Sequence, residues 1–123
     1  MKRILVIDDD DLTRATIRDM LETSGYEVDE AENGSDGVLK QQDRPFDLIV
    51  TDVLMPDKDG IETIIDLKRG YPNLRIIAIS GGGTTGNLVF LEMSTRFGAD
   101  KMLAKPFSNL QLLDAVESLL TTR

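Results

Sequence analysis

Short aliphatic runs alternate with segments of helical periodicity along the chain, and this alternation constrains the fold more than any other feature. The runs at residues 3–7, 47–51 and 75–79 are apolar at their centres and rich in Ile and Val, which is typical of strands covered on both faces. Weaker strands are expected at 27–31 and 101–104. Apolar residues at helical spacing predict helices over about 12–21, 34–42, 60–69, 86–97 and 110–120.

This repeated order of strand and helix predicts an α/β fold with a doubly wound, five-stranded parallel sheet and five helices on its two faces. The flavodoxin-like strand order 2-1-3-4-5 fits such units best. The chain has 123 residues, with no internal repeat and no long linker. A chain of this length can form one hydrophobic core, so we expect a single domain over residues 1–123.

Charge and composition exclude several classes of function. The formal net charge is −8, which disfavours direct contact with nucleic acid or an anionic membrane. The chain contains neither Cys nor His, so it has no thiolate metal site and no internal histidine that could relay a phosphoryl group. No apolar run is long enough to span a bilayer, and we expect a cytoplasmic protein.

Polar side chains lie at the predicted carboxyl ends of four strands. The first strand ends at Asp8 and Asp9, and the later strands end at Asp52, Ser80 and Lys105. In a parallel sheet these ends share one edge, and ligands bind there at the point where the strand order reverses. We therefore expect these five residues to form one site.

Each acidic residue also has a simpler structural interpretation. Asp10 or Asp11 is expected to cap the helix that begins near Leu12, and Asp57 and Asp59 read as turn residues. Asp52, Ser80 and Lys105 taken singly could be a turn residue, a loop residue and a surface charge. Their joint placement at strand ends favours a functional site.

The chemistry of this group points to a metal-assisted phosphoryl site. Clustered carboxylates without His or Cys suit a hard cation, and a site with few protein oxygens suits Mg²⁺ better than Ca²⁺. The hydroxyl of Ser80 and the ammonium of Lys105 are then available to hold a phosphoryl group. Such positioning and charge stabilisation is most of what phosphoryl transfer requires.

Four segments, "VIDDD", "DLIVTDVLMPDKDG", "IIAISGG" and "GADKMLAKPF", resemble the signatures of the response-regulator receiver domain. This family is the phospho-acceptor module of two-component signalling, and the match runs in register from about residue 2 to residue 121. The strand order given above is also the order of this family, so the two expectations are not independent.

The resemblance implies a role for each matching residue. Asp52 would accept the phosphoryl group as an acyl phosphate, and Ser80 and Lys105 would bind it. Asp9 would ligate Mg²⁺ directly, Asp8 would do so partly through water, and Asp52 would be the third carboxylate ligand. The remaining implied features are the backbone carbonyl of Leu54 as a metal ligand, a cis Lys105–Pro106 bond and backbone freedom at Gly60.

The resemblance also implies partners rather than a free substrate. The donor would be a phosphohistidine on a sensor histidine kinase or a histidine phosphotransfer protein, because this chain has no His. Its catalysis would be limited to its own phosphorylation and dephosphorylation, so it would not be an enzyme in the usual sense. Its signal would pass to a downstream protein through the face formed by the fourth helix, the fifth strand and the fifth helix.

Three features modify this pattern. Met102 stands where receivers commonly carry Tyr or Phe, so an aromatic switch cannot operate. Gly81, Gly82 and Gly83 follow Ser80, and we expect a mobile loop in the unphosphorylated state. Four consecutive apolar residues, Leu88 to Leu91, exceed what one buried helix face needs and leave apolar surface for docking.

Alternatives from other classes remain open at this stage. Asp9-x-Asp11-x-Thr13 resembles the first motif of haloacid-dehalogenase-type phosphatases, in which Asp9 would be the nucleophile, although a downstream acidic pair is missing. A receiver-like scaffold that does not depend on phosphorylation is a second alternative. A flavin carrier on the same fold is disfavoured by the four Asp residues after the first strand and by an aromatic content of 5%.

Overall fold

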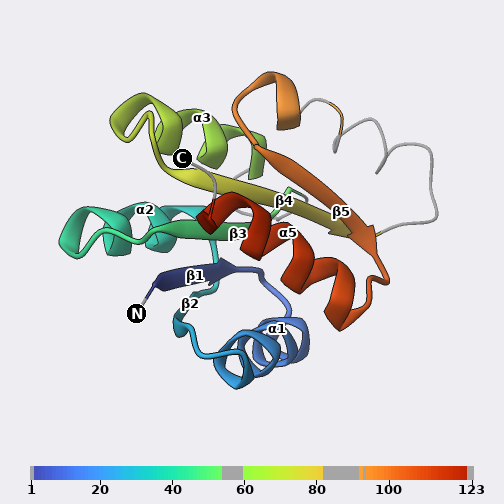
Figure 1. Cartoon of the computed structure of the whole chain (residues 1–123). Coiled ribbons are helices and arrows are strands. Elements are labelled where there is room, and N and C mark those ends of the chain that lie inside the picture. Colours follow the sequence, from blue (N-terminus) through green and yellow to red (C-terminus); the bar gives the residue numbers. More distant parts are fainter. Residues whose placement is uncertain (1, 54–59, 82–91, 93, 122–123) are drawn as a thin grey trace.

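The computed structural model describes residues 2–53, 60–81, 92 and 94–121. It contains a five-stranded sheet in the order β2-β1-β3-β4-β5, in which all neighbouring strands are parallel (Figure 1). The strands are β1 (Arg3–Ile7), β2 (Glu27–Ala31), β3 (Leu48–Asp52), β4 (Arg75–Gly81) and β5 (Lys101–Lys105). The predicted fold class and strand order are confirmed.

Helices cover both faces of this sheet (Figure 1). They are α1 (Asp11–Thr23), α2 (Gly34–Asp43), α3 (Gly60–Gly70) and α5 (Asn109–Thr121). Residues 92 and 94–96 are helical, but most of the helix predicted at 86–97 lies outside the described residues. No helix in the described part of the chain is both long and apolar enough to cross a membrane.

Two hydrophobic clusters hold the layers together, one on each face. Ile4 and Val6 of β1 belong to the cluster that includes α1 and α5, whereas Leu5 and Ile7 belong to the cluster that includes α3. This division follows from the alternation of side chains along a strand. All four residues are fully buried, so β1 is covered on both faces, and it is paired on both edges by β2 and β3.

The helix ends decide between the expected caps. Asp10 is the N-cap of α1, and its carboxylate accepts the backbone N–H of Thr13 at 3.0 Å. Asp11 therefore lies in the first turn of α1. Ser108 caps α5, because its hydroxyl accepts the N–H of Gln111 while the Gln111 side chain accepts the N–H of Ser108. This reciprocal pair is a capping box.

Strand register places the carboxyl ends of the strands at one edge of the sheet. Asp52 pairs with Ile79, and the next two residues of β4, Ser80 and Gly81, pair with Ala104 and Lys105 of β5. β4 thus ends at Gly81, one residue beyond its predicted end at Ser80. The extension keeps Ser80 inside the sheet, next to the strand that carries Lys105.

Candidate functional site

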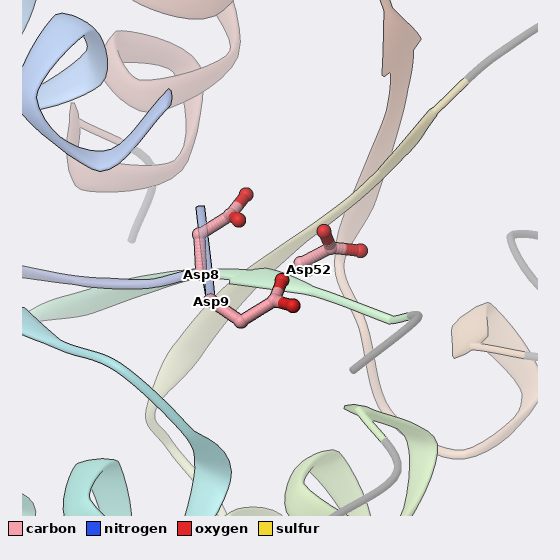
Figure 2. A group of neighbouring side chains, drawn as sticks. All are labelled: Asp8, Asp9 and Asp52. Atoms are coloured by element: carbon pink, nitrogen blue, oxygen red, sulfur yellow. The ribbon is translucent and has the colours of Figure 1, made fainter. Parts of the chain in front are cut away.

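Three carboxylates meet at the carboxyl edge of the sheet (Figure 2). Asp8 and Asp9 directly follow β1, and Asp52 is the last residue of the neighbouring strand β3. One carboxylate oxygen from each residue lies within 4.8 Å of one from each of the others. The structure therefore brings together the three residues that the sequence predicts as carboxylate ligands.

Burial makes this cluster costly without a cation. Asp8 is fully buried and Asp52 is 5% exposed, whereas Asp9 is exposed. Like charges at such distances repel, and desolvation adds to the cost of keeping two of them ionised. The cluster is thus a place where a positive charge is strongly stabilising.

Lys105 supplies one such charge from β5. Its Nζ lies 3.0 Å from Asp8 Oδ2 and 3.3 Å from Asp52 Oδ2. Burial pulls the pKa of Lys105 down, but the negative charge of Asp52 and the hydrogen bond to Asp8 outweigh it, so the pKa is raised above its ordinary value. Lys105 is therefore a permanent cation that bridges two strand ends.

The donor set also fits a hard divalent ion. All three side chains offer carboxylate oxygens, which are the ligands that Mg²⁺ prefers, and exposed Asp9 leaves the site open to water on one side. Leu54, whose carbonyl is the fourth predicted ligand, lies outside the described residues.

The hydroxyl of Ser80 is available for a ligand. Ser80 is fully buried, and within the described part of the chain its Oγ is a buried side-chain atom without a hydrogen-bond partner. Buried polar atoms are usually paired, because an unpaired one costs about 1–3 kcal/mol. Ser80 directly follows Ile79, the residue of β4 that pairs with Asp52. Its unpaired hydroxyl is consistent with a site that binds an acceptor oxygen during function.

The structure tests three further expectations near the site. The Lys105–Pro106 bond is cis, as predicted. Gly60 does not have a positive φ; it is required instead because a Cβ there would lie 2.3 Å from the carbonyl oxygen of Asp52. Met102 is 45% exposed on β5. Gly82, Gly83 and Leu88 to Leu91 lie outside the described residues.

Sequence reasoning missed one residue that contacts this site. Arg14 of α1 is 8% exposed, and its Nη1 donates to the backbone carbonyl of Asp8 at 2.8 Å. A signal existed, because Arg14 follows the N-cap Asp10 by about one helical turn and must lie near the end of β1. Its buried position depends on packing against β2, which periodicity alone does not reveal.

Comparison with known proteins agrees with this geometry. The family model of the response regulator receiver domain matches residues 4–117. The response regulator receiver protein CpdR of Brucella abortus is 36% identical over 121 residues, covering 98% of each chain. The chemotaxis protein CheY of Halobacterium salinarum is 32% identical over 120 residues, again covering 98% of each chain. The chain therefore belongs to the response regulator receiver domain family.

A solved structure gives the same result for the fold. The receiver domain of NtrX from Brucella abortus superposes with a TM-score of 0.91 at 28% identity, covering 98% of this chain and 99% of that chain. Receiver domains are phosphoryl-accepting modules of two-component signalling rather than enzymes in the usual sense. They bind Mg²⁺ through an acidic pocket, and they act with histidine kinases or phosphotransfer proteins and with downstream targets.

Proposed function

We propose that this chain accepts a phosphoryl group on Asp52 from a phosphohistidine of a separate protein, in a reaction that requires Mg²⁺. One observation carries the proposal. The carboxylates of Asp8, Asp9 and Asp52 converge within 4.8 Å, and Lys105 bridges two of them. A site that served only stability would not need three converging carboxylates at a sheet edge.

Asp8, Asp9 and Asp52 would hold the ion, together with the backbone carbonyl of Leu54. When bound, Mg²⁺ neutralises the carboxylates and the phosphoryl oxygens, so that two anionic groups can approach each other. Asp9, the exposed member of the cluster, gives the site its open side. Buried Asp8 is held in place by Lys105 and by the backbone N–H of Asp10, which donates to its Oδ1 at 2.9 Å.

In the transfer step a carboxylate oxygen of Asp52 attacks phosphorus. The bond between phosphorus and the imidazole nitrogen of the donor breaks, and its electron pair stays on that nitrogen. The new bond is a mixed anhydride between carboxylate and phosphate. No proton needs to leave Asp52, which fits a chain that contains no His to act as a base.

Lys105 and Ser80 stabilise the transferred group in this proposal. The Nζ of Lys105 already contacts Asp52 Oδ2 at 3.3 Å, so it is placed to follow the negative charge onto a phosphoryl oxygen. The buried hydroxyl of Ser80 donates to a second oxygen, which gives that hydroxyl the partner it lacks in the described structure.

We further propose the context in which this reaction acts. The domain spans residues 1–123 and works in the cytoplasm, where a sensor histidine kinase or a histidine phosphotransfer protein supplies the phosphoryl group. Phosphorylation then changes contacts with a downstream protein at the face formed by the fourth helix, β5 and α5. Direct binding to nucleic acid or membrane is not expected at a net charge of −8.

Intact mass spectrometry with acetyl phosphate as a small-molecule donor tests the proposal. We expect one phosphoryl group on the wild-type protein in the presence of Mg²⁺, and none when Mg²⁺ is chelated or when Asp52 is replaced in Asp52→Asn. Labelling that persists in Asp52→Asn but disappears in Asp9→Asn would favour the phosphatase-like alternative. No labelling of the wild type by either acetyl phosphate or a phosphorylated histidine phosphotransfer protein would favour the phosphorylation-independent scaffold.

A further inference from the structure

Arg14 connects the acidic cluster to a network of ion pairs on the neighbouring strand. Its guanidinium makes three hydrogen bonds with three different nitrogens. Nη1 donates to the carbonyl oxygen of Asp8 at 2.8 Å, Nη2 donates to Asp11 Oδ1 at 2.6 Å, and Nε donates to Glu30 Oε1 at 3.1 Å. Because the planar guanidinium cannot rotate one nitrogen without moving the others, the two carboxylates fix the direction of the bond to Asp8.

The network itself is anchored on both sides. Glu30 of β2 also accepts a hydrogen bond from Arg18 Nη1 at 2.9 Å. The hydrogen bond from Arg18, opposed by burial and supported by the hydrogen bond from Arg14, lowers the pKa of Glu30. Burial works against the charge of Arg14, but its hydrogen bonds to Asp11 and Glu30 outweigh that effect and raise its pKa. Arg14 and Glu30 are therefore both charged at neutral pH.

The bond from Arg14 acts on the peptide group that joins Asp8 to Asp9. Every polar group of Asp8 has a partner: its N–H donates to the Ala31 carbonyl, and its two carboxylate oxygens accept from the Asp10 N–H and from Lys105. The carboxylate of Asp9 is different, because no hydrogen bond or ion pair to it occurs among the described residues. The position of Asp9 therefore depends on its own backbone, which begins at the carbonyl that Arg14 holds.

From this geometry we infer that Arg14 is a positioning residue, which orients the Asp8–Asp9 peptide so that Asp9 presents its carboxylate to the divalent cation. The inference rests on the proposed function, since it assigns a role to Arg14 at the same site. Arg14 does not touch the ion or the phosphoryl group. Residues that orient ligands in this way typically contribute about tenfold or more to metal affinity.

The charge of Arg14 and its positioning role predict opposite changes in Mg²⁺ affinity when Arg14 is replaced by Met. Arg14→Met removes a positive charge near a site for a dication, so charge alone would make Mg²⁺ bind more tightly. Loss of the hydrogen bond to Asp8 would make it bind more weakly. Arg18→Met is the matched control, because Arg18 also lies on α1 and pairs with Glu30 but, within the described part of the chain, makes no hydrogen bond or ion pair with Asp8.

The experiment is a calorimetric titration of each protein with Mg²⁺ alone, without any phosphoryl donor. We expect the dissociation constant to rise about tenfold in Arg14→Met and to stay unchanged or fall in Arg18→Met. Amide hydrogen exchange of metal-free protein is a second readout, and we expect faster exchange at Asp9 in Arg14→Met only. Equal or tighter Mg²⁺ binding in Arg14→Met would overturn the inference.

Two controls keep the result decisive. If Arg14→Met fails to fold, Arg14→Lys retains the charge, but its three N–H donors share one nitrogen and lack the planar fork by which three separate nitrogens of Arg14 reach Asp8, Asp11 and Glu30. We expect severalfold weaker Mg²⁺ binding in Arg14→Lys, and wild-type affinity would overturn the inference. If wild-type protein itself binds no Mg²⁺, the proposed function fails and the role of Arg14 fails with it. If the wild type binds Mg²⁺ and accepts a phosphoryl group, but Arg14→Met and Arg18→Met bind Mg²⁺ with the same affinity, only the positioning role is wrong.

Discussion

Replacing Lys105 by Met should separate the stability of the site from its chemistry. The ammonium lies 3.0 Å from Asp8 and 3.3 Å from Asp52. At an effective dielectric constant of about 20, each contact is worth about 5 kcal/mol before the cost of burial. Removing one partner of a buried ion pair costs about 3–5 kcal/mol. The Lys105 side chain is 25% exposed, so we expect a loss of about 2–3 kcal/mol in the free energy of unfolding.

Mg²⁺ binding and phosphorylation should then change in opposite directions. Without the ammonium, the carboxylates of Asp8 and Asp52 attract a dication more strongly, and we expect Mg²⁺ affinity to rise on the order of tenfold. Transfer from acetyl phosphate at saturating Mg²⁺ should slow on the order of a hundredfold, because a donor to the phosphoryl oxygens is lost. Saturating Mg²⁺ should also restore more stability to Lys105→Met than it adds to the wild type.

Urea unfolding followed by far-ultraviolet circular dichroism, with and without Mg²⁺, measures the stability, since the chain has no Trp. Lys101→Met is the matched control, because Lys101 is an exposed lysine on the same strand. We expect little change in this control. The reasoning would be refuted if Lys105→Met were as stable as Lys101→Met in the absence of Mg²⁺, or if it bound Mg²⁺ more weakly than the wild type.

Three other predictions follow from single contacts. Gly60→Ala should lose about 2–3 kcal/mol of stability and become phosphorylated more slowly, because its Cβ would lie 2.3 Å from the Asp52 carbonyl oxygen. Gly70→Ala is the control, because a Cβ at Gly70 has open space around it. We expect this control to be neutral in the same urea unfolding and phosphoryl-labelling assays. Ser80→Ala should keep or gain up to about 1 kcal/mol of stability while acetyl phosphate labels it more slowly, and a clear loss of stability would show that the hydroxyl has a structural partner. The pKa of Glu30 is lowered in the folded state, chiefly by the hydrogen bond from Arg18. The ionised Glu30 therefore stabilises the fold above its ordinary pKa, and this stabilisation is lost as the pH falls through the lowered value. Urea unfolding across acidic pH should therefore show a smaller acid-induced loss for Glu30→Gln than for the wild type, and parallel curves would contradict this.

Much of the fold follows from local sequence pattern. The bounds of β1 are those predicted, because Arg3–Ile7 is buried on both faces and ends at a charged cluster. β3 begins one residue later than predicted, since the Asp47 carboxylate accepts the N–H of Arg3 at 2.8 Å just before the strand. Gly81 reads as the start of a glycine-rich loop, but pairing with Lys105 of β5 keeps it in β4. Such distant pairing is not visible in a local window.

The candidate site was predictable to a similar extent. Residues at strand ends could be placed because parallel strands end at a common edge, and Asp8, Asp9, Asp52, Ser80 and Lys105 lie there. The ion-pair network could not be predicted in the same way. Whether Arg14 is a solvated charge or a buried hydrogen-bond donor depends on how α1 packs on β2. Helical periodicity predicts only which face of α1 is apolar.

The site of covalent attachment tests the central claim most directly. After incubation with acetyl phosphate and Mg²⁺, reduction with borohydride converts a phosphorylated aspartate to homoserine, and peptide mapping by mass spectrometry locates the changed residue. The account predicts homoserine in place of Asp52 and unchanged aspartate at Asp8 and Asp9. Homoserine at Asp9, or at no aspartate of a protein that has gained a phosphoryl group, would contradict it.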